Sequence, residues 1–317
     1  MNQEVYIYPS ANNKWEISSL IFTPQEATPI RGIIQLSHGM CEYTARYHPL
    51  AEALCRAGFV FCGGDHLGHG ATARLNGEQL GYFGPRGSRK FLIEDLELLR
   101  REMVRRYPGV PCFLLGHSMG SFIARLYAVR FGKELDGLIL SGTAGSNPAL
   151  GFGKLLARSM EAVKGPRYIS KKVYQLANGG FSSAIPDART PVDWLSKDPD
   201  LCAAYLKDPL CTFQFTVSAY YELFSMLEEC NSADWYRKMP RELPIYLLSG
   251  GKDPVGAMGE GPREVYRRLI EAGCRQVKLK LYPNGRHEMF NEVEKEEVKA
   301  NLLSWLDQIT GTPAPSA

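Results

Sequence analysis

The chain has 317 residues, and its 37 lysines and arginines nearly balance its 34 aspartates and glutamates, which leaves a net charge of +3. Hydrophobic residues make up 44% and charged residues 22%, as in ordinary globular proteins. This composition excludes a mostly disordered chain, a collagen and a coiled coil. It gives no support for a nucleic-acid partner, because a surface that follows phosphates needs a larger or clustered positive charge.

The cysteines and the N-terminus bear on the cellular compartment. None of the eight cysteines has C-x-x-C spacing and most lie in apolar runs, so we expect buried, reduced thiols. The first residues, MNQEVYIYPSANNKWE, lack the basic and apolar regions of a signal peptide. The chain has no run of 18 apolar residues, which is about the length that a helix needs to span a membrane. We therefore expect a cytoplasmic protein.

Strand and helix patterns alternate along the first half of the chain. We expect strands over residues 15–22, 32–36, 59–62, 111–115 and 135–140, and helices over residues 44–57, 88–107 and 121–131. Ser88 is expected to cap the long helix that ends before Pro108. The apolar strands favour a mostly parallel central sheet with helices on both faces.

This alternation stops after Ser141. Residues 146–235 show amphipathic helical patterns instead, with apolar faces formed by Leu155, Leu156, Met160 and Val163, and by Phe213, Val217, Tyr220, Phe224 and Leu227. Strands over 244–248 and 277–282 and helices over 262–272 and 294–309 then resume the pattern. We therefore expect an α/β core of residues 1–145 and 236–317 with a helical cap of residues 146–235. The last residues, GTPAPSA, are expected to form a flexible tail.

The residues 116–120, GHSMG, match the pattern G-x-S-x-G. Alone the pattern is weak, but here the apolar run PCFLL precedes it and the helix-like SFIARLYAVRF follows it. A strand, a tight turn and a helix in this order lift a serine hydroxyl above the edge of a sheet. The turn needs glycine beside the serine because a Cβ atom would not fit. Ser118 is therefore the candidate nucleophile.

A serine nucleophile needs a histidine base and an acid that orients the histidine. After a G-x-S-x-G turn of this kind, the acid comes first in the sequence and the histidine second. His287 is the one histidine of the six that follows Ser118, and it lies in a loop just after the strand VKLKLY. Asp253 follows the strand PIYLL and a pair of glycines, so we expect it to lie at the same edge of the sheet as His287. We predict that Asp253 orients His287 and stabilises its charged form.

The tetrahedral oxyanion needs two hydrogen-bond donors. The backbone N–H of Met119, directly after Ser118, is the first. The second is expected in the loop after an early strand, where SHGM follows GIIQL, and Met40 is the candidate backbone donor.

Two other motifs have weaker support. Residues 68–73, GHGATA, satisfy G-x-G-x-x-A but lack an acidic residue about 20 positions further on, so dinucleotide binding is disfavoured. Asp65, His66 and His69 do not follow a recognised metal-ligand spacing. We expect a packed structural loop there, and neither a metal nor a cofactor in the reaction.

With these motifs assembled, the chain resembles the monoacylglycerol lipase and lysophospholipase group of the α/β-hydrolase superfamily, whose sequence family is also labelled serine aminopeptidase. Four segments carry the resemblance: SHGMCEYTARYHPLAEAL, GGDHLGHGATA, FLLGHSMGSFIARLYA, and LLSGGKDPVG paired with LYPNGRHEMFNE. It implies an α/β-hydrolase fold with Ser118 as nucleophile, Asp253 as acid, His287 as base, and Met40 and Met119 at the oxyanion hole. The chain departs from the family at Tyr43, where histidine is frequent, and at Ser121, where a second glycine is frequent.

The sequence thus predicts a serine hydrolase that cleaves carboxylic esters through an acyl-enzyme, with single-chain acyl esters such as monoacylglycerols or lysophospholipids as substrates. We expect some of the cap aromatics to line an apolar channel above Ser118, and the cap to contact lipid surfaces transiently.

A peptidase of the prolyl type remains open. It would need an acidic pair among cap residues such as Glu161, Glu222, Glu228 and Glu229. An acyltransferase also remains open, whereas a non-catalytic binding module is disfavoured because no triad residue is missing. The oligomeric state does not follow from the sequence.

Overall fold

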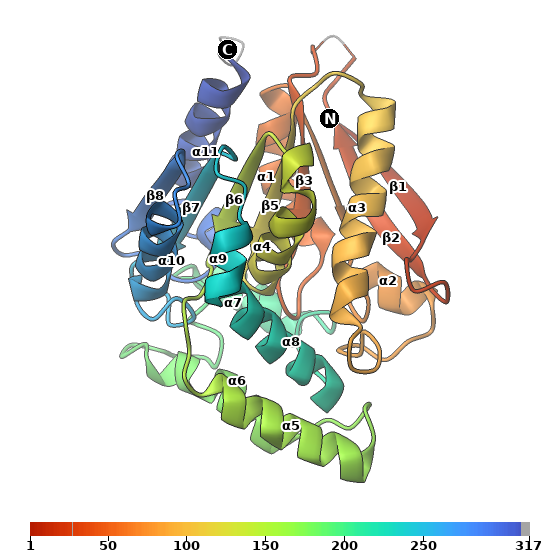
Figure 1. Cartoon of the computed structure of the whole chain (residues 1–317), viewed down its shortest axis with the longest axis vertical. Helices are drawn as coiled ribbons and strands as arrows, with labels where there is room; N and C mark the ends of the chain where they lie inside the picture. Colours follow the sequence, from red (N-terminus) through yellow and green to blue (C-terminus); the bar gives the residue numbers. More distant parts are fainter. Residues whose placement is uncertain (27, 312–317) are drawn as a thin grey trace.

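The computed structural model describes residues 1–26 and 28–311, so residues 312–317 of the expected tail lie outside it. Eight strands form one sheet in the order β1-β2-β4-β3-β5-β6-β7-β8 (Figure 1). β2 pairs antiparallel with both β1 and β4, and every other neighbouring pair is parallel. The predicted mostly parallel sheet is confirmed.

The strands agree with the sequence analysis except at the first. Their bounds are β1 (Asn2–Pro9), β2 (Glu16–Thr23), β3 (Gly32–Ser37), β4 (Phe59–Gly64), β5 (Cys112–His117), β6 (Gly137–Ser141), β7 (Ile245–Gly250) and β8 (Val277–Tyr282). β1 was not predicted, and it is an edge strand with most of its side chains in solvent. Such a strand has no buried face to produce an apolar pattern.

A helix over residues 70–75, part of the segment expected to be a packed loop, was not predicted, and two other core helices differ from the prediction at their N-termini. The core helices are α1 (His48–Arg56), α2 (Gly70–Leu75), α3 (Arg89–Arg106), α4 (Met119–Phe131), α10 (Glu260–Glu271) and α11 (Lys295–Thr310). The helix expected from residue 44 is instead a 3-10 turn, Thr44–Tyr47, followed by α1. Ser88 does not cap α3, because its own backbone is already helical and its hydroxyl donates to the Pro85 carbonyl.

Both faces of the sheet are buried. In β5, Cys112 and Leu114 join the core cluster that contains residues of α3 and α4. Phe113 and Leu115 alternate with them and pack in the opposite cluster, with residues of α1 and α11. Because both faces are covered, successive strand residues are all apolar, which is why these strands read as continuous hydrophobic runs.

Five helices lie between β6 and β7: α5 (Leu150–Lys164), α6 (Lys171–Ser183), α7 (Pro199–Lys207), α8 (Val217–Cys230) and α9 (Ala233–Lys238). We call residues 146–235 the cap segment. Figure 1 shows α5 and α6 on the far side of α8 from the sheet. The apolar face expected on α5 is only partly buried, since Leu155 is 62% and Val163 79% exposed. Among the described residues, no helix is both long and apolar enough to cross a bilayer.

Candidate active site

Ser118 lies in the tight turn between β5 and α4. Its backbone has φ 51° and ψ −121°, a conformation that non-glycine residues rarely adopt and that costs on the order of 1–3 kcal/mol. The turn is fixed because the Ser118 N–H donates to the Ser141 carbonyl at 2.9 Å and the Ser121 N–H donates to the Ser118 carbonyl at 2.8 Å. The chain thus presents Ser118 at the start of α4, above the carboxyl edge of the sheet.

Gly120 permits this turn to pack against β3. A Cβ atom at residue 120 would lie 1.9 Å from the Ser37 carbonyl oxygen, far inside van der Waals contact. The glycine therefore lets α4 approach the start of the loop that contains Gly39 and Met40. A Cβ atom at Gly39 would in turn lie 3.1 Å from the Ser118 Cβ, so this loop passes directly beside Ser118.

His287 and Asp253 form a buried hydrogen-bonded pair. The imidazole Nδ1 lies 2.9 Å from Asp253 Oδ2, and both side chains are almost completely buried. A second oxygen of Asp253 accepts the Val255 N–H at 2.9 Å, which fixes the carboxylate. With Nδ1 held by Asp253, the other ring nitrogen is the one left free to accept a proton.

The surroundings of His287 determine its ionisation. Burial lowers the pKa of this imidazole, but the charge of Asp253 and the hydrogen bond to it outweigh burial, so the pKa is raised above the usual histidine value. The rings of His117 and Trp194 lie 4.7 Å and 5.2 Å from the His287 ring. Burial, then the neighbouring His287, lowers the pKa of His117 to about 3. His117 therefore stays neutral beside the imidazole that titrates.

The loop after β3 contains Met40, one of the two expected oxyanion donors. Met40 precedes Cys41, whose φ of 55° is in the left-handed region. The Gly39 N–H donates to the Glu42 carboxylate, which closes the loop on itself. Met119, the other expected donor, is buried at the first position of α4.

A buried charge network joins this loop to the histidine loop. The Arg46 guanidinium binds Glu42 at 3.0 Å and Glu288 through two hydrogen bonds of 2.9 Å and 2.8 Å. Burial raises the pKa of Glu42, whereas at Glu288 the attraction of Arg46 outweighs burial and lowers the pKa. Glu42 belongs to the loop after β3 and Glu288 directly follows His287, so Arg46 links one loop to the other.

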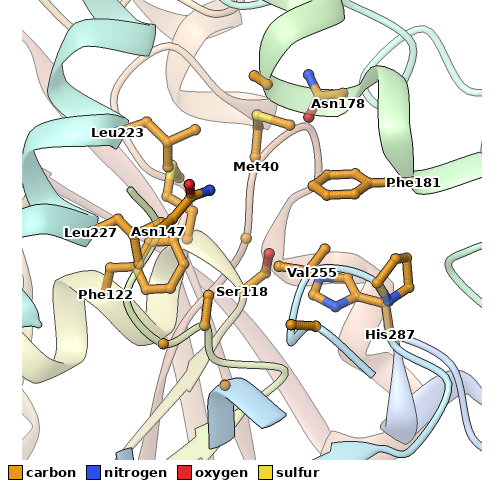
Figure 2. Close-up of a pocket in the computed structure, with 18 of the residues that line it drawn as sticks. Met40, Ser118, Phe122, Asn147, Asn178, Phe181, Leu223, Leu227, Val255 and His287 are labelled. Atoms are coloured by element: carbon orange, nitrogen blue, oxygen red, sulfur yellow. The ribbon is translucent and has the colours of Figure 1, made fainter. Parts of the chain in front are cut away.

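A cavity of about 900 Å³ lies above Ser118. Figure 2 shows Ser118 and His287 at its floor, Met40 between its two sides, Phe122, Leu223 and Leu227 on one side, and Phe181 on the other. Its aromatic residues from the cap segment are Phe181, Trp194, Tyr205 and Phe224. Its walls also contain aliphatic side chains such as Leu176 and Leu223, and the other cap aromatics include buried ones such as Tyr220 and exposed ones such as Phe152.

Sequence reasoning did not identify several residues that surround the three candidates. Ser121, one of the two departures from the family, donates its hydroxyl to the Ser118 carbonyl at 2.6 Å. The backbone carbonyls of Trp194 and Leu195 accept the N–H groups of His287 and Glu288. No local motif encodes the contacts of Trp194 and Leu195, since they join segments about 90 residues apart in sequence.

The loop of residues 65–70 is packed, as expected. Asp65 accepts the backbone N–H groups of Thr44 and Ala71, and the ring nitrogen of His66 lies 3.0 Å from the Ser37 hydroxyl. Within the described part of the chain, no group of three or more His, Cys, Asp or Glu residues is placed to hold a metal ion. All eight cysteines are free and buried.

Comparison with known proteins shows which family the chain belongs to. The pattern that defines the family "Serine aminopeptidase, S33" matches residues 28–294. The monoacylglycerol lipase of Mycolicibacterium smegmatis is 29% identical over 90% of this chain and 91% of its own length. The human monoglyceride lipase is 27% identical, over 89% of this chain and 84% of its own.

Solved structures extend the likeness to the whole fold. A thermostable carboxyl esterase from Bacillus coagulans, in complex with glycerol, superposes with a TM-score of 0.91 at 34% identity and covers 98% of this chain and 99% of its own. A lipase in an open form superposes with a TM-score of 0.87 at 29% identity, with the same coverage. The family pattern spans most of the chain and the fold agrees with these enzymes. The chain therefore belongs to the serine aminopeptidase S33 family of α/β-hydrolases, and it is a hydrolase of the esterase and lipase type.

Proposed function

We propose that this protein is a serine hydrolase that cleaves carboxylic esters through an acyl-enzyme, with single-chain acyl esters such as monoacylglycerols or lysophospholipids as substrates. One observation carries the proposal. Ser118, in its strained turn, and His287, paired with Asp253, share the floor of one large cavity with many apolar side chains in its walls. A nucleophile, a base and an acyl-sized space thus meet at one point.

In this mechanism His287 takes the proton of the Ser118 hydroxyl as Oγ attacks the ester carbonyl. Asp253 stabilises the imidazolium, and the backbone N–H groups of Met40 and Met119 bind the oxyanion of the tetrahedral intermediate. His287 then gives its proton to the departing alkoxide. A water molecule, activated by the same imidazole, hydrolyses the acyl-enzyme and returns Ser118 to its starting state. The reaction needs no metal or cofactor.

The shape of the cavity supports a single long acyl chain. The side chains of Phe122, Leu223 and Leu227 form an apolar wall that begins beside Ser118 (Figure 2). Each methylene that leaves water for such a wall contributes roughly 0.8 kcal/mol. The names of the relatives from Mycolicibacterium smegmatis and human, both lipases of monoacylglycerols, agree with this substrate class.

The outer face of the cap segment supports transient contact with lipid surfaces. Phe152, Leu155 and Val163 lie along α5 and are 63%, 62% and 79% exposed. Exposed apolar side chains gathered on one helix are typical of surfaces that contact lipid or protein. A lipid surface is the source from which a single-chain acyl ester would enter.

The structure gives no specific support for the peptidase alternative. Of the cap carboxylates considered for an amine site, Glu161 pairs with Arg86, Glu228 with Lys154, and Glu222 and Glu229 with Arg89. Among the described residues, none of these four carboxylates lines the cavity above Ser118. A substrate amine would therefore meet no free acidic pair contributed by the cap.

The test is a series of activated esters from acetyl to octanoyl, measured below their micellar limits. We expect kcat/KM to rise at least about tenfold along the series. The six added methylenes could contribute about 5 kcal/mol at most, and ordering of the acyl chain opposes part of this. Mono-octanoylglycerol should be preferred to tri-octanoylglycerol.

A serine-reactive phosphonate should label Ser118 alone. A series that peaks at acetyl, or a faster aminoacyl-amide substrate, would contradict the proposed substrate class, and product esters formed when an alcohol is added would indicate an acyltransferase.

A further inference from the structure

The loop that contains Met40 is held from the side of the cap as well as from the core. On the core side, the Glu42 carboxylate accepts the Gly39 N–H and Asp65 accepts the Thr44 N–H at 2.8 Å. These contacts flank residues 40–43 without touching the Cys41 carbonyl. Cys41 has a φ of 55°, which a non-glycine residue keeps only when its surroundings hold it there.

Three hydrogen bonds from the cap segment reach this stretch. The Tyr205 hydroxyl donates to the Cys41 carbonyl at 3.0 Å, and the Cys41 thiol donates to the Phe213 carbonyl at 3.3 Å. The Tyr43 hydroxyl donates to Asp208 Oδ2 at 2.6 Å. Tyr205 lies in the last turn of α7, and Asp208 and Phe213 lie in the loop between α7 and α8. We call residues 205–213 the 205–213 strap.

The strap is itself fixed. Asp208 accepts the Leu210 N–H at 2.8 Å through its other oxygen, and its backbone carbonyl accepts the Cys211 N–H at 2.9 Å. The Arg46 guanidinium lies over the Tyr205 ring, 5.0 Å from its centre, and so contacts one face of the phenol. Tyr205 and Met40 both line the cavity, so Tyr205 borders the space that the acyl group would occupy.

From these contacts we propose that Tyr205 and the Tyr43–Asp208 pair are positioning residues for the oxyanion hole, and that the cap sets the Met40 N–H for catalysis through them. The proposal rests on the proposed function. It assigns a purpose to Tyr43, one of the two positions where the chain departs from its family. Because the oxyanion develops in the transition state, correct placement of a donor affects turnover more than substrate binding.

The experiment compares Tyr205→Phe and Tyr43→Phe with the wild type on an octanoyl ester. Loss of one buried hydroxyl that bonds a carbonyl should lower kcat about fivefold to tenfold, and loss of the charge-assisted bond to Asp208 about tenfold or more. KM should stay within twofold. A trifluoromethyl ketone, which forms a tetrahedral adduct with the serine, should bind more weakly by the same factor as kcat falls. The matched control is Tyr168→Phe, on a cap tyrosine that is 40% exposed and does not line the cavity; it should change nothing.

The outcomes separate this proposal from the function on which it rests. A wild type that neither hydrolyses esters nor reacts with a phosphonate at Ser118 would overturn both. An active wild type with Tyr205→Phe and Tyr43→Phe variants of equal kcat would overturn the positioning role alone. So would a fall in kcat without the matching loss of ketone affinity, because the defect would then lie outside the oxyanion hole. Should one variant fail to fold, as judged by its Tm, the other decides.

Discussion

The α/β core and the cap segment present side chains to the same cavity in different ways. In the core, Ser118, Asp253 and His287 each lie just after a strand, so the sheet itself brings the three residues to one edge. In the cap, the lining residues come from α5, α6, α7, α8 and the loops between them. We therefore expect the core residues to determine the chemistry and the cap residues to determine which substrate is bound.

The largest effect should come from the core residues and should not depend on the substrate. We expect Ser118→Ala, Asp253→Asn and His287→Ala each to lower kcat by at least about 10³ for acetyl and octanoyl esters alike, with the fold intact. Circular dichroism and Tm serve as the control for folding. Wild-type turnover by Ser118→Ala would refute the assignment of the nucleophile.

The contrast between core and cap also explains what the sequence could predict. The strands β5 and β7 are buried on both faces and produce continuous apolar runs, whereas the partly buried β8 shows an alternation of apolar residues and lysines. The ends of these three strands, and with them the three candidate residues, could therefore be located from the sequence alone. The edge strand β1 was missed because most of its side chains face solvent.

The cap was harder to predict. Leu155 and Leu156 are neighbours in one apolar stripe, yet Leu155 faces solvent while Leu156 packs against the core cluster. A helix with a cavity on one side and solvent on the other carries apolar residues on both sides, so its pattern does not show which face is inside. The strap contacts of Tyr205 and Tyr43 could not be predicted either, because they join residues more than 160 positions apart.

The pH dependence of activity is the next test of the core. His287 must be neutral to accept the Ser118 proton, and its pKa in the folded protein is raised by Asp253. We therefore expect kcat/KM to fall tenfold per pH unit on the acid side, with a midpoint above the usual histidine value of about 6.5. In Asp253→Asn the charge that raises the pKa is gone while burial remains, so the midpoint of the residual activity should move to lower pH. A profile that is flat from pH 8 to pH 5 would mean that another group is the base.

A change in the cap wall should discriminate between substrates instead. Leu227 lines the cavity from α8 on the side of Phe122 (Figure 2). We expect Leu227→Trp to lower kcat/KM for octanoyl esters at least about tenfold, because the larger ring occupies space that the acyl chain needs. Acetyl esters should change less than about threefold. The same substitution on the outer face of α5, Leu155→Trp, is the matched control and should leave both substrates unaffected. Equal losses on both esters would show that this wall does not hold the acyl chain.

The smallest expected effect lies where core and cap meet, at His69. The ring is fully buried, 5.5 Å from the ring of Phe213 and 5.3 Å from that of Phe215, both in the cap segment. Its Nδ1 lies 3.0 Å from the Leu67 carbonyl oxygen, and its Nε2 has no hydrogen-bond partner among the described residues. Burial, then the neighbouring His38, lowers the pKa of His69 to about 3. The imidazole therefore stays neutral in the folded protein over most of the acid range.

This depressed pKa gives stability a defined pH dependence. Between about pH 6.5 and pH 3 the unfolded chain binds a proton at His69 that the folded protein does not, so folding becomes less favourable as the pH falls through that window, by up to about 1.4 kcal/mol per pH unit. His69→Phe removes the imidazole that binds this proton in the unfolded chain. We expect the free energy of unfolding, measured in urea from pH 7.5 to pH 4.5, to fall less steeply with acidification in the variant than in the wild type. At pH 7.5 the variant should be less stable by about 1 kcal/mol, because the hydrogen bond to Leu67 is lost. Parallel curves for the two proteins would show that His69 takes up its proton in the folded state as readily as in the unfolded chain, and that the contact between this loop and the cap aromatics is open to water.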